Sequence, residues 1–158
     1  MQLTELFSPA DFLLGFAPGD KWAAISSMME HLVKSGRCDD ATSEALHEAV
    51  LARERSMSTG MERGIAIPHA AVDDLAEVIA CIGVVADKEG LAFESVDGRP
   101  TRIIVLLLIP RAQKLLHIRT LADIARVLGK DSVREELLEA KTGDDALRAL
   151  ATGEAAIT

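Results

Sequence analysis

The sequence has few of the residues that carry several common functions. Aromatic residues make up only 3% of the 158 residues, and no run of Lys or Arg is present. The formal net charge is −8, which repels a phosphate backbone, so we expect no nucleic-acid partner. The two cysteines, Cys38 and Cys81, show neither the spacing of a metal site nor a disulfide framework. We therefore expect both to be free thiols.

Long hydrophobic runs are also missing. The segment from Met1 to Ser8 has no basic stretch followed by a long apolar run, and every later apolar run is shorter than the roughly 20 residues that span a membrane. We expect a cytoplasmic protein without membrane insertion. A chain of 158 residues suits one compact domain, residues 1–158, and is too short for two of ordinary size.

Helices are predicted in the first third of the chain. Asp20 precedes a helical repeat of apolar residues that ends at Gly36. Asp39 or Asp40 then caps a second helix, which runs to about Arg55. Both helices are expected to pack one face inward.

Further helices are predicted by capping patterns and by periodicity. Residues 8–11, 132–135 and 142–145 each combine a capping residue with an acidic residue in the first turn, and residues 115–128 are strongly periodic. The chain therefore ends in a helical segment.

The middle of the chain is predicted to form strands. Residues 78–86 and 103–109 are continuous apolar runs, as expected for central strands covered on both faces. Residues 65–69 read as a short strand that ends at a proline, and residues 90–93 as a possible edge strand. Two helices, then strands, then helices indicate an α/β domain with helices on both faces of one sheet.

Among the four histidines, His69 is the main candidate for chemistry. Pro68 restricts the backbone before it, so its ring is expected where a strand gives way to a loop, a usual place for ligands in α/β sheets. The two alanines that follow leave room for a macromolecule to approach the ring. A core histidine bonded to backbone would explain the strand end but not these small neighbours.

His117 and Arg53 are ambiguous from sequence alone. His117 lies on the apolar stripe of the 115–128 helix and should face the sheet, either as a core residue or as a hydrogen-bond donor beside His69. Arg53 suits phosphate oxygens, but a cation in the last turn of a helix is also favoured by the helix dipole. His31 and His47 lie inside amphipathic helices and are interpreted as surface or boundary residues.

A metal site is the competing interpretation of the same residues. His69, Asp73, Asp74 and His117 offer imidazole and carboxylate ligands. No two histidines have the helical spacing of a zincin, and the two aspartates read as a solvated loop. We therefore expect neither a metal nor a cofactor.

The segment from Arg53 to Ala70 resembles the active-site segment of a known family. Its Arg-Glu pair, its Ser-Thr-Gly and its Gly-Ile-Ala-Ile-Pro-His match the EIIA type-2 proteins of the bacterial phosphoenolpyruvate-dependent phosphotransferase system (PTS), which include fructose, mannitol and nitrogen-regulatory IIA proteins. The resemblance continues through Phe93, the Asp-Gly-Arg-Pro at 97–100, the strand at 103–109 and His117. It implies a single α/β domain with a mixed sheet between helices.

The resemblance implies that the chain is a histidine phosphocarrier. In that family the histidine of the Pro-His motif accepts a phosphoryl group on Nε2 from a small carrier, HPr or its nitrogen-branch relative, while an oxygen holds the Nδ1 proton. That role corresponds to His69. The arginine of the Arg-Glu pair and the later helical histidine lie beside the phosphorylated ring, which corresponds to Arg53 and His117.

The sequence leaves more than one acceptor of the phosphoryl group open. The chain carries no fused partner domain, which favours a nitrogen-regulatory IIA that acts on target proteins, and a sugar-specific IIA that donates to a IIB domain is the alternative. The family usually has glycine in place of Glu62, whose charge would oppose a unit negative charge about 8 Å away by roughly 2 kcal/mol at an effective dielectric near 20. Arg63 is adjacent and opposite in sign. Glu62 leaves open a regulatory binding module that is not phosphorylated.

Overall fold

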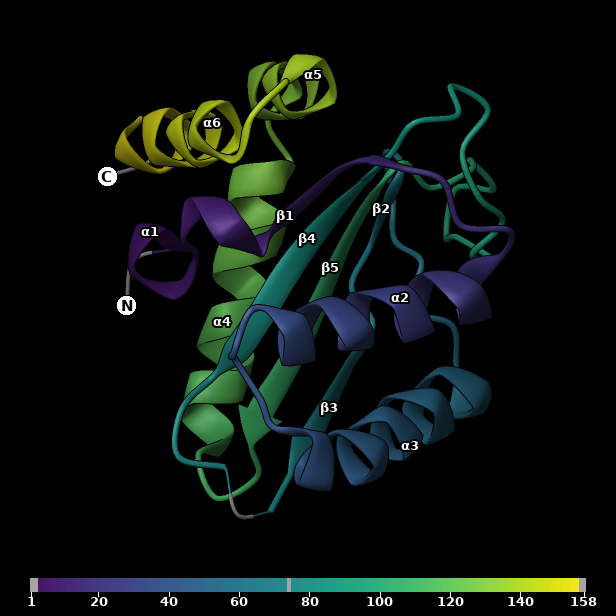
Figure 1. Cartoon of the computed structure of the whole chain (residues 1–158). Helices are drawn as coiled ribbons and strands as arrows, with labels where there is room; N and C mark the ends of the chain where they lie inside the picture. Colours follow the sequence, from purple (N-terminus) through teal and green to yellow (C-terminus); the bar gives the residue numbers. More distant parts are fainter. Residues whose placement is uncertain (1–2, 74, 157–158) are drawn as a thin grey trace.

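The computed structural model describes residues 3–73 and 75–156 and shows one mixed sheet with helices on both faces (Figure 1). None of the helices in these two ranges is both long and apolar enough to span a membrane. The elements in chain order are α1 (Leu3–Leu6), the 3-10 helix η1 (Pro9–Asp11), β1 (Phe12–Phe16), α2 (Lys21–Lys34), α3 (Asp40–Ser56), β2 (Ile65–Ala66), β3 (His69–Val72), β4 (Ile79–Val85), β5 (Ile103–Pro110), α4 (Lys114–Leu128), α5 (Asp131–Glu139) and α6 (Gly143–Ala155).

The sheet is built around β5. The strand order is β1-β4-β5-β2. β3 also pairs with β5, further along that strand than β2 does. Only the β4–β5 pair is antiparallel among the pairs of these strands; the others are parallel. Every residue of β5 is buried, which explains why its sequence is a continuous apolar run rather than an alternating one.

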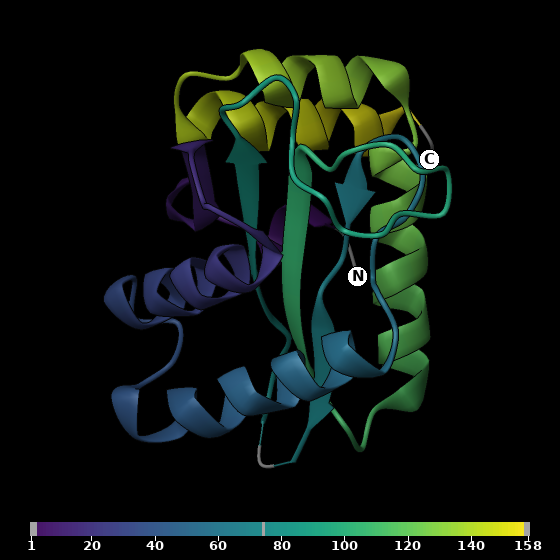
Figure 2. The same ribbon diagram turned by 90° about the vertical axis from the view of Figure 1, so that its right-hand side faces the viewer.

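Side chains of β5 alternate between two hydrophobic cores. Ile103, Val105 and Leu107 pack in the core on the α4 side, whereas Ile104 and Leu106 pack in the core under α2 and α3. This alternation follows from the two-residue period of a strand. Figure 2 shows the strands between α2 and α3 on one side and α4 on the other, with α5 and α6 across the top.

The edge formed by β2 and β3 is interrupted at Ile67 and Pro68. The Pro68 carbonyl accepts from Leu107 N at 3.0 Å, and Ile67 N–H donates to the Thr59 carbonyl at 3.1 Å, so the loop after α3 covers this edge. The pairing with β5 resumes at His69, which lies opposite Leu107. β2 thus ends before the proline, as predicted, but His69 begins β3, so the expectation that its ring lies where a strand gives way to a loop was wrong. Proline removes one donor but leaves the backbone extended, so the strand pairing can resume after it.

Helices start at four of the five caps that the sequence predicts, beginning with Ser8, the N-cap of η1. The side chains of Asp20, Asp39 and Thr142 each accept a backbone N–H in the first turn of α2, α3 and α6. The cap predicted at Ser132 was wrong, since α5 already begins at Asp131. Only two residues connect α4 to α5, so the new helix starts before the serine can cap it.

One strand was not predicted, and one predicted strand is only a bridge. β1 was not predicted, and it pairs in parallel with β4 through a register that shifts between Leu13 and Phe16, where Gly15 has a φ of 62°. This five-residue strand lacks the alternation that identifies a strand. The strand predicted at residues 90–93 is a single bridge between Leu91 and Thr101.

Both cysteines are free thiols, as predicted. Burial raises the pKa of Cys81, which lies inside β4, far above its ordinary value. Burial, and then the charges of Asp39 and Asp40, also raise the pKa of Cys38. Neither thiol has the low pKa of a reactive thiolate.

Candidate functional site

His69 points toward the α4 side of the sheet. Its neighbours Ala70 and Val72 pack in the core under α2 and α3, so alternation places the His69 ring on the opposite face. There it meets His117 of α4, with the ring centroids 5.5 Å apart and the ring planes at 75°. The structure therefore brings together the two histidines singled out in the sequence, and both are partly buried.

The two nitrogens of the His69 ring have different surroundings. Nδ1 lies 2.7 Å from the Ile67 carbonyl oxygen. Because a carbonyl only accepts, this contact assigns the proton to Nδ1 and the lone pair to Nε2. Nε2 makes no hydrogen bond with any residue of the described ranges.

The surroundings of His69 favour the neutral ring. Burial lowers the pKa of His69 below its ordinary value of 6.5, and the charges of Arg53 and His117 lower it further. The bond to the Ile67 carbonyl and the charge of Glu54 act in the opposite direction without reversing the shift. At neutral pH the ring therefore has an available lone pair on Nε2.

A cavity of about 260 Å³ lies beside the His69 ring and is also lined by Arg53. Its walls come from the end of α3, the loop after it, the β2–β3 edge and α4. The remaining lining residues are Ser58, Thr59, Gly60, Met61, Ile67 and Leu121. The cavity places a permanent positive charge and an imidazole on one small volume, an arrangement suited to a compact anionic group.

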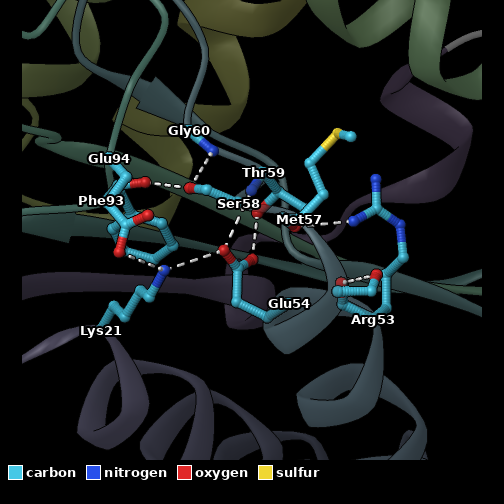
Figure 3. Close-up of polar contacts among 10 residues, drawn as sticks. Lys21, Arg53, Glu54, Met57, Ser58, Thr59, Gly60, Phe93 and Glu94 are labelled. Atoms are coloured by element: carbon cyan, nitrogen blue, oxygen red, sulfur yellow. Dashed lines mark hydrogen bonds and ion pairs between the residues drawn. The ribbon is translucent and has the colours of Figure 1, made fainter.

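Arg53 has two roles that sequence could not separate. Its Nη1 donates to the Met57 carbonyl at 2.8 Å, just beyond the end of α3 (Figure 3). Its charge also lowers the pKa of His69, and its side chain lines the same cavity. The guanidinium therefore bonds to the backbone at the helix end and still presents its charge and other N–H groups near the ring.

The loop next to the cavity is held by a buried ion pair that the sequence reasoning missed. Glu54 Oε2 accepts from Lys21 Nζ at 3.2 Å and from Thr59 N at 3.0 Å, and Oε1 accepts from the Thr59 hydroxyl (Figure 3). Lys21 and Glu54 are 8% and 3% exposed. These contacts of Glu54 connect α2, α3 and the loop. Breaking the pair would leave an uncompensated buried charge, which is unfavourable.

A close backbone approach explains the glycine in the Ser-Thr-Gly motif. Ser58 donates its hydroxyl to the Phe93 carbonyl and accepts from Gly60 N–H. A Cβ at Gly60 would lie 2.6 Å from that same carbonyl oxygen, so a larger residue would displace the loop. The motif around 58–60 therefore packs against Phe93, the distant residue included in the resemblance.

Glu62 lies outside the His69 cavity. It is exposed and lines a different cavity, of about 360 Å³, with Met61 and Val96. Solvent screens an exposed charge in such a position. The neighbouring Arg63 extends to the Gly129 carbonyl, 2.6 Å from its Nη1.

The residues considered for a metal site have other arrangements. Within residues 3–73 and 75–156, no group of three or more His, Cys, Asp or Glu side chains could hold a metal ion. Asp73 forms an exposed ion pair with Arg111, at 3.3 Å. Asp74 lies outside the described residues.

The other two histidines have local partners. His31 Nε2 lies 2.6 Å from the Ala10 carbonyl oxygen, and His47 Nε2 lies 3.1 Å from the Ser26 hydroxyl. These contacts connect neighbouring elements and do not involve the His69 cavity.

The fold and the site define a mixed α/β protein that presents a neutral imidazole next to an arginine. Comparison with known proteins then identifies the family. The chain belongs to the EIIA 2 family of the phosphoenolpyruvate-dependent sugar phosphotransferase system, whose profile matches residues 5–152. This match confirms the resemblance seen in the sequence. Members of this family are phosphoryl-transfer components.

Relatives of known function fall into two groups. The chain is 31% identical to the fructose-specific EIIABC component of Bacillus subtilis over 91% of its own length and 22% of that protein, and 34% identical to the fructose-specific EIIA component of Haloferax volcanii over 79% of each. It is 28% identical to the nitrogen regulatory protein of Pseudomonas aeruginosa over 91% of each chain. The chain therefore spans about a fifth of the Bacillus protein, and about four-fifths or more of the other two.

Solved structures show the same fold. The nitrogen regulatory protein IIA-Ntr of Neisseria meningitidis superposes with a TM-score of 0.82 at 23% identity, covering 94% of this chain and 98% of that one. The mannitol IIA of Escherichia coli has a TM-score of 0.74 at 25% identity, covering 91% and 98%. A mannitol IIA from the same organism has also been solved in complex with phosphorylated enzyme IIB, with a TM-score of 0.76 at 23% identity over 92% and 97%.

Proposed function

We propose that this chain is a histidine phosphocarrier and that His69 Nε2 accepts the phosphoryl group. The observation that carries the proposal is the 2.7 Å contact of His69 Nδ1 with the Ile67 carbonyl, beside a cavity that also contains Arg53. This contact leaves Nε2 as the nucleophilic nitrogen. The lowered pKa of His69 keeps that nitrogen unprotonated at neutral pH.

The donor in this proposal is the phosphohistidine of an HPr-like carrier. As the new N–P bond forms at His69 Nε2, the N–P bond to the donor histidine breaks, with attacking and leaving nitrogens in line. Charge then spreads over three equatorial oxygens. Arg53 supplies a permanent positive charge to them and His117 supplies a ring N–H, so the transfer needs no metal.

The phosphoryl group must leave His69 again, and the site suits a transient occupant. It has one arginine and one second imidazole, which is fewer cations than a tight phosphate site would present. Binding the group only moderately keeps the phosphorylated state from becoming a trap.

For the acceptor, we infer a regulatory target protein, as for a nitrogen-regulatory IIA. The support is that the Pseudomonas nitrogen regulatory protein matches over 91% of each chain, so the likeness covers nearly a whole regulatory protein. A sugar-specific role is the second candidate, favoured by the higher identity, 34%, to the Haloferax fructose-specific EIIA component. In that role the acceptor is a IIB domain, like the partner in the solved mannitol complex.

The proposal is tested by incubating the chain with phosphoenolpyruvate, enzyme I and an HPr-like carrier. We expect one phosphate per chain on His69, labile in acid and stable in base, because a phosphoramidate hydrolyses when its nitrogen is protonated. Mass spectrometry that places a stable phosphate on Ser58 or Thr59 instead would contradict it. No incorporation of phosphate would favour the unphosphorylated binding module.

The acceptor is tested with the phosphorylated chain. Rapid loss of the label to a fructose-type or mannitol-type IIB domain would establish the sugar-specific role. Retention of the label in the presence of IIB, together with target binding that differs between the two phosphorylation states, would establish the regulatory role.

A further inference from the structure

A second cavity, of about 240 Å³, lies between the β4–β5 connection, the turn before β2 and α5. Five of its nine lining residues are cationic and none is acidic. The cations are Arg63, Lys88, Arg99, Arg102 and Arg134, and we call this cavity the basic pocket. The whole chain carries 17 basic and 25 acidic residues, so the basic pocket is a local concentration of positive charge in an acidic protein.

Backbone carbonyls hold three of the five cations in place. These bonds orient each guanidinium without neutralising its charge, because a carbonyl is uncharged. The donors and acceptors are Arg63 Nη1 to Gly129 O at 2.6 Å, Arg102 Nη2 to Val85 O at 2.9 Å, and Arg134 Nη1 to Leu128 O at 2.8 Å.

Acidic neighbours offset only part of the charge. Arg134 pairs with Asp131, and Arg99 Nε lies 3.8 Å from Asp97. Asp97 also accepts the backbone N–H groups of Arg63 and Arg99, at 2.8 and 3.0 Å. Lys88 forms no ion pair or hydrogen bond with the part of the chain that the structure describes.

One N–H donor of Arg102 has no acceptor within the described residues. Its Nε is buried and has no partner among residues 3–73 and 75–156. A buried donor on a charged group without an acceptor is unfavourable unless a negative charge lies nearby. An anion in the basic pocket would supply that charge.

We propose that the basic pocket binds a small metabolite that carries a phosphate or pyrophosphate group. Arginine forks match the oxygens of such groups in pairs. The volume, about 240 Å³, is below the roughly 300–1,000 Å³ of drug-sized ligand sites, so the ligand is compact. The net charge of −8 disfavours a nucleic acid as the source of the phosphate.

The basic pocket is separate from the His69 cavity. Ile103 lines the basic pocket, whereas Leu107 of the same strand pairs with His69. Four residues of strand span about 13 Å. Along the chain, only Glu62 separates Met61 of the His69 cavity from Arg63 of the basic pocket.

Isothermal titration calorimetry with pyrophosphate at low salt tests the proposal on the full chain. We expect the double variant K88Q/R99Q, which changes two exposed side chains, to bind pyrophosphate at least tenfold more weakly. The matched control is R148Q, which removes an exposed cation of α6 that pairs with Asp145. The control should retain the affinity of the unchanged protein.

Amide chemical shifts locate the bound pyrophosphate. Shifts confined to Gly64 and residues 99–103 are the expected result, and they should persist in R53Q, which separates this site from the His69 cavity. Equal weakening in R148Q, or shifts centred on residues 67–71, would overturn the proposal. So would binding of a phosphoserine peptide but not of pyrophosphate. Absence of phosphorylation at His69 would leave the expected pyrophosphate result unchanged.

Discussion

The His69 cavity and the basic pocket lie at two positions along β5, and both present arginine side chains to a small volume. The first is lined by one arginine and the His69 imidazole, whose ring also contacts that of His117, and the second is lined by five cations. In the two proposals an anionic group binds at either place, and only the first site offers it a nucleophilic nitrogen.

The two regions are also supported differently. The loop beside the His69 cavity depends on the buried pair of Lys21 and Glu54, and His69 itself on a backbone bond. The cations of the basic pocket are held mainly by main-chain carbonyls from surrounding elements. Changes in one region should therefore leave the other intact, and the first prediction below tests that separation.

The largest effect is expected for H69A. Removing the only proposed acceptor nitrogen should abolish phosphorylation by the carrier, while pyrophosphate binding at the basic pocket stays unchanged. Phosphate incorporation and calorimetry measure the two quantities on one preparation. Phosphorylation of H69A at the normal level would contradict the assignment of the acceptor.

The next effect concerns folding stability. E54A leaves the buried Lys21 with only the exposed Glu94 carboxylate, 4.0 Å away, and breaking a buried ion pair of this kind costs about 3–5 kcal/mol. We expect a corresponding loss in the free energy of unfolding, measured with urea. E44A, an exposed position on the same helix α3, is the control and should change stability by less than about 0.5 kcal/mol. A similar small loss in both variants would mean that the Lys21–Glu54 contact does not support the loop.

R53Q should lower the rate of phosphoryl transfer by about tenfold or more. A charge-assisted hydrogen bond is worth about 1.5–3 kcal/mol, and about 1.4 kcal/mol is a factor of ten in rate. The Met57 bond is at an exposed helix end, so thermal stability should change little.

The control for Arg53 is R55Q, two residues further along the helix and about 200° around it. Arg55 is exposed, and R55Q should transfer phosphate at nearly the normal rate. Equal losses in both variants would show that general positive charge attracts the carrier, and a loss of stability without a loss of rate would limit Arg53 to the helix end.

A smaller effect is expected for H117A. His117 is partly buried with its ring 5.5 Å from that of His69, so its loss removes one donor and leaves a gap without breaking a charge pair. We expect transfer to slow several-fold with the fold retained, measured by rapid quench and circular dichroism. An unchanged rate would return His117 to the role of a core residue.

The smallest expected effect is a change in the pKa of His69. The pKa of His69 lies below 6.5, chiefly because of burial and also because of the charges of Arg53 and His117. The transfer rate should therefore be constant above pH 6.5 and fall as the pH drops through the folded-state pKa. R53Q should move the pKa upward, which NMR titration of the ring measures.

The same group links pH to stability. The folded-state pKa is lowered, so the unfolded chain binds the proton first as the pH falls. The contribution of His69 to stability is present above pH 6.5, and it decreases between 6.5 and the folded-state value. A pKa of His69 above 6.5 in the folded protein would contradict both predictions.

Local sequence determined much of this protein. Caps at Asp20, Asp39 and Thr142 begin helices as predicted, because an N-cap bond involves only residues within one turn. The continuous apolar run of β5 predicted a strand buried on both faces, since burial of both faces excludes polar residues at alternate positions. The motif from Arg53 to Ala70 pointed to the family that the comparison confirmed.

Tertiary structure alone decided which distant side chains meet. β1 has no periodicity of its own and forms because β4 offers it a partner. The pairing of Lys21 with Glu54, the 5.5 Å approach of His117 to His69, and the meeting of five cations at the basic pocket each join separate elements. The order of residues specifies local bonds directly, but such contacts depend on how the packed faces align, which is a property of the whole core.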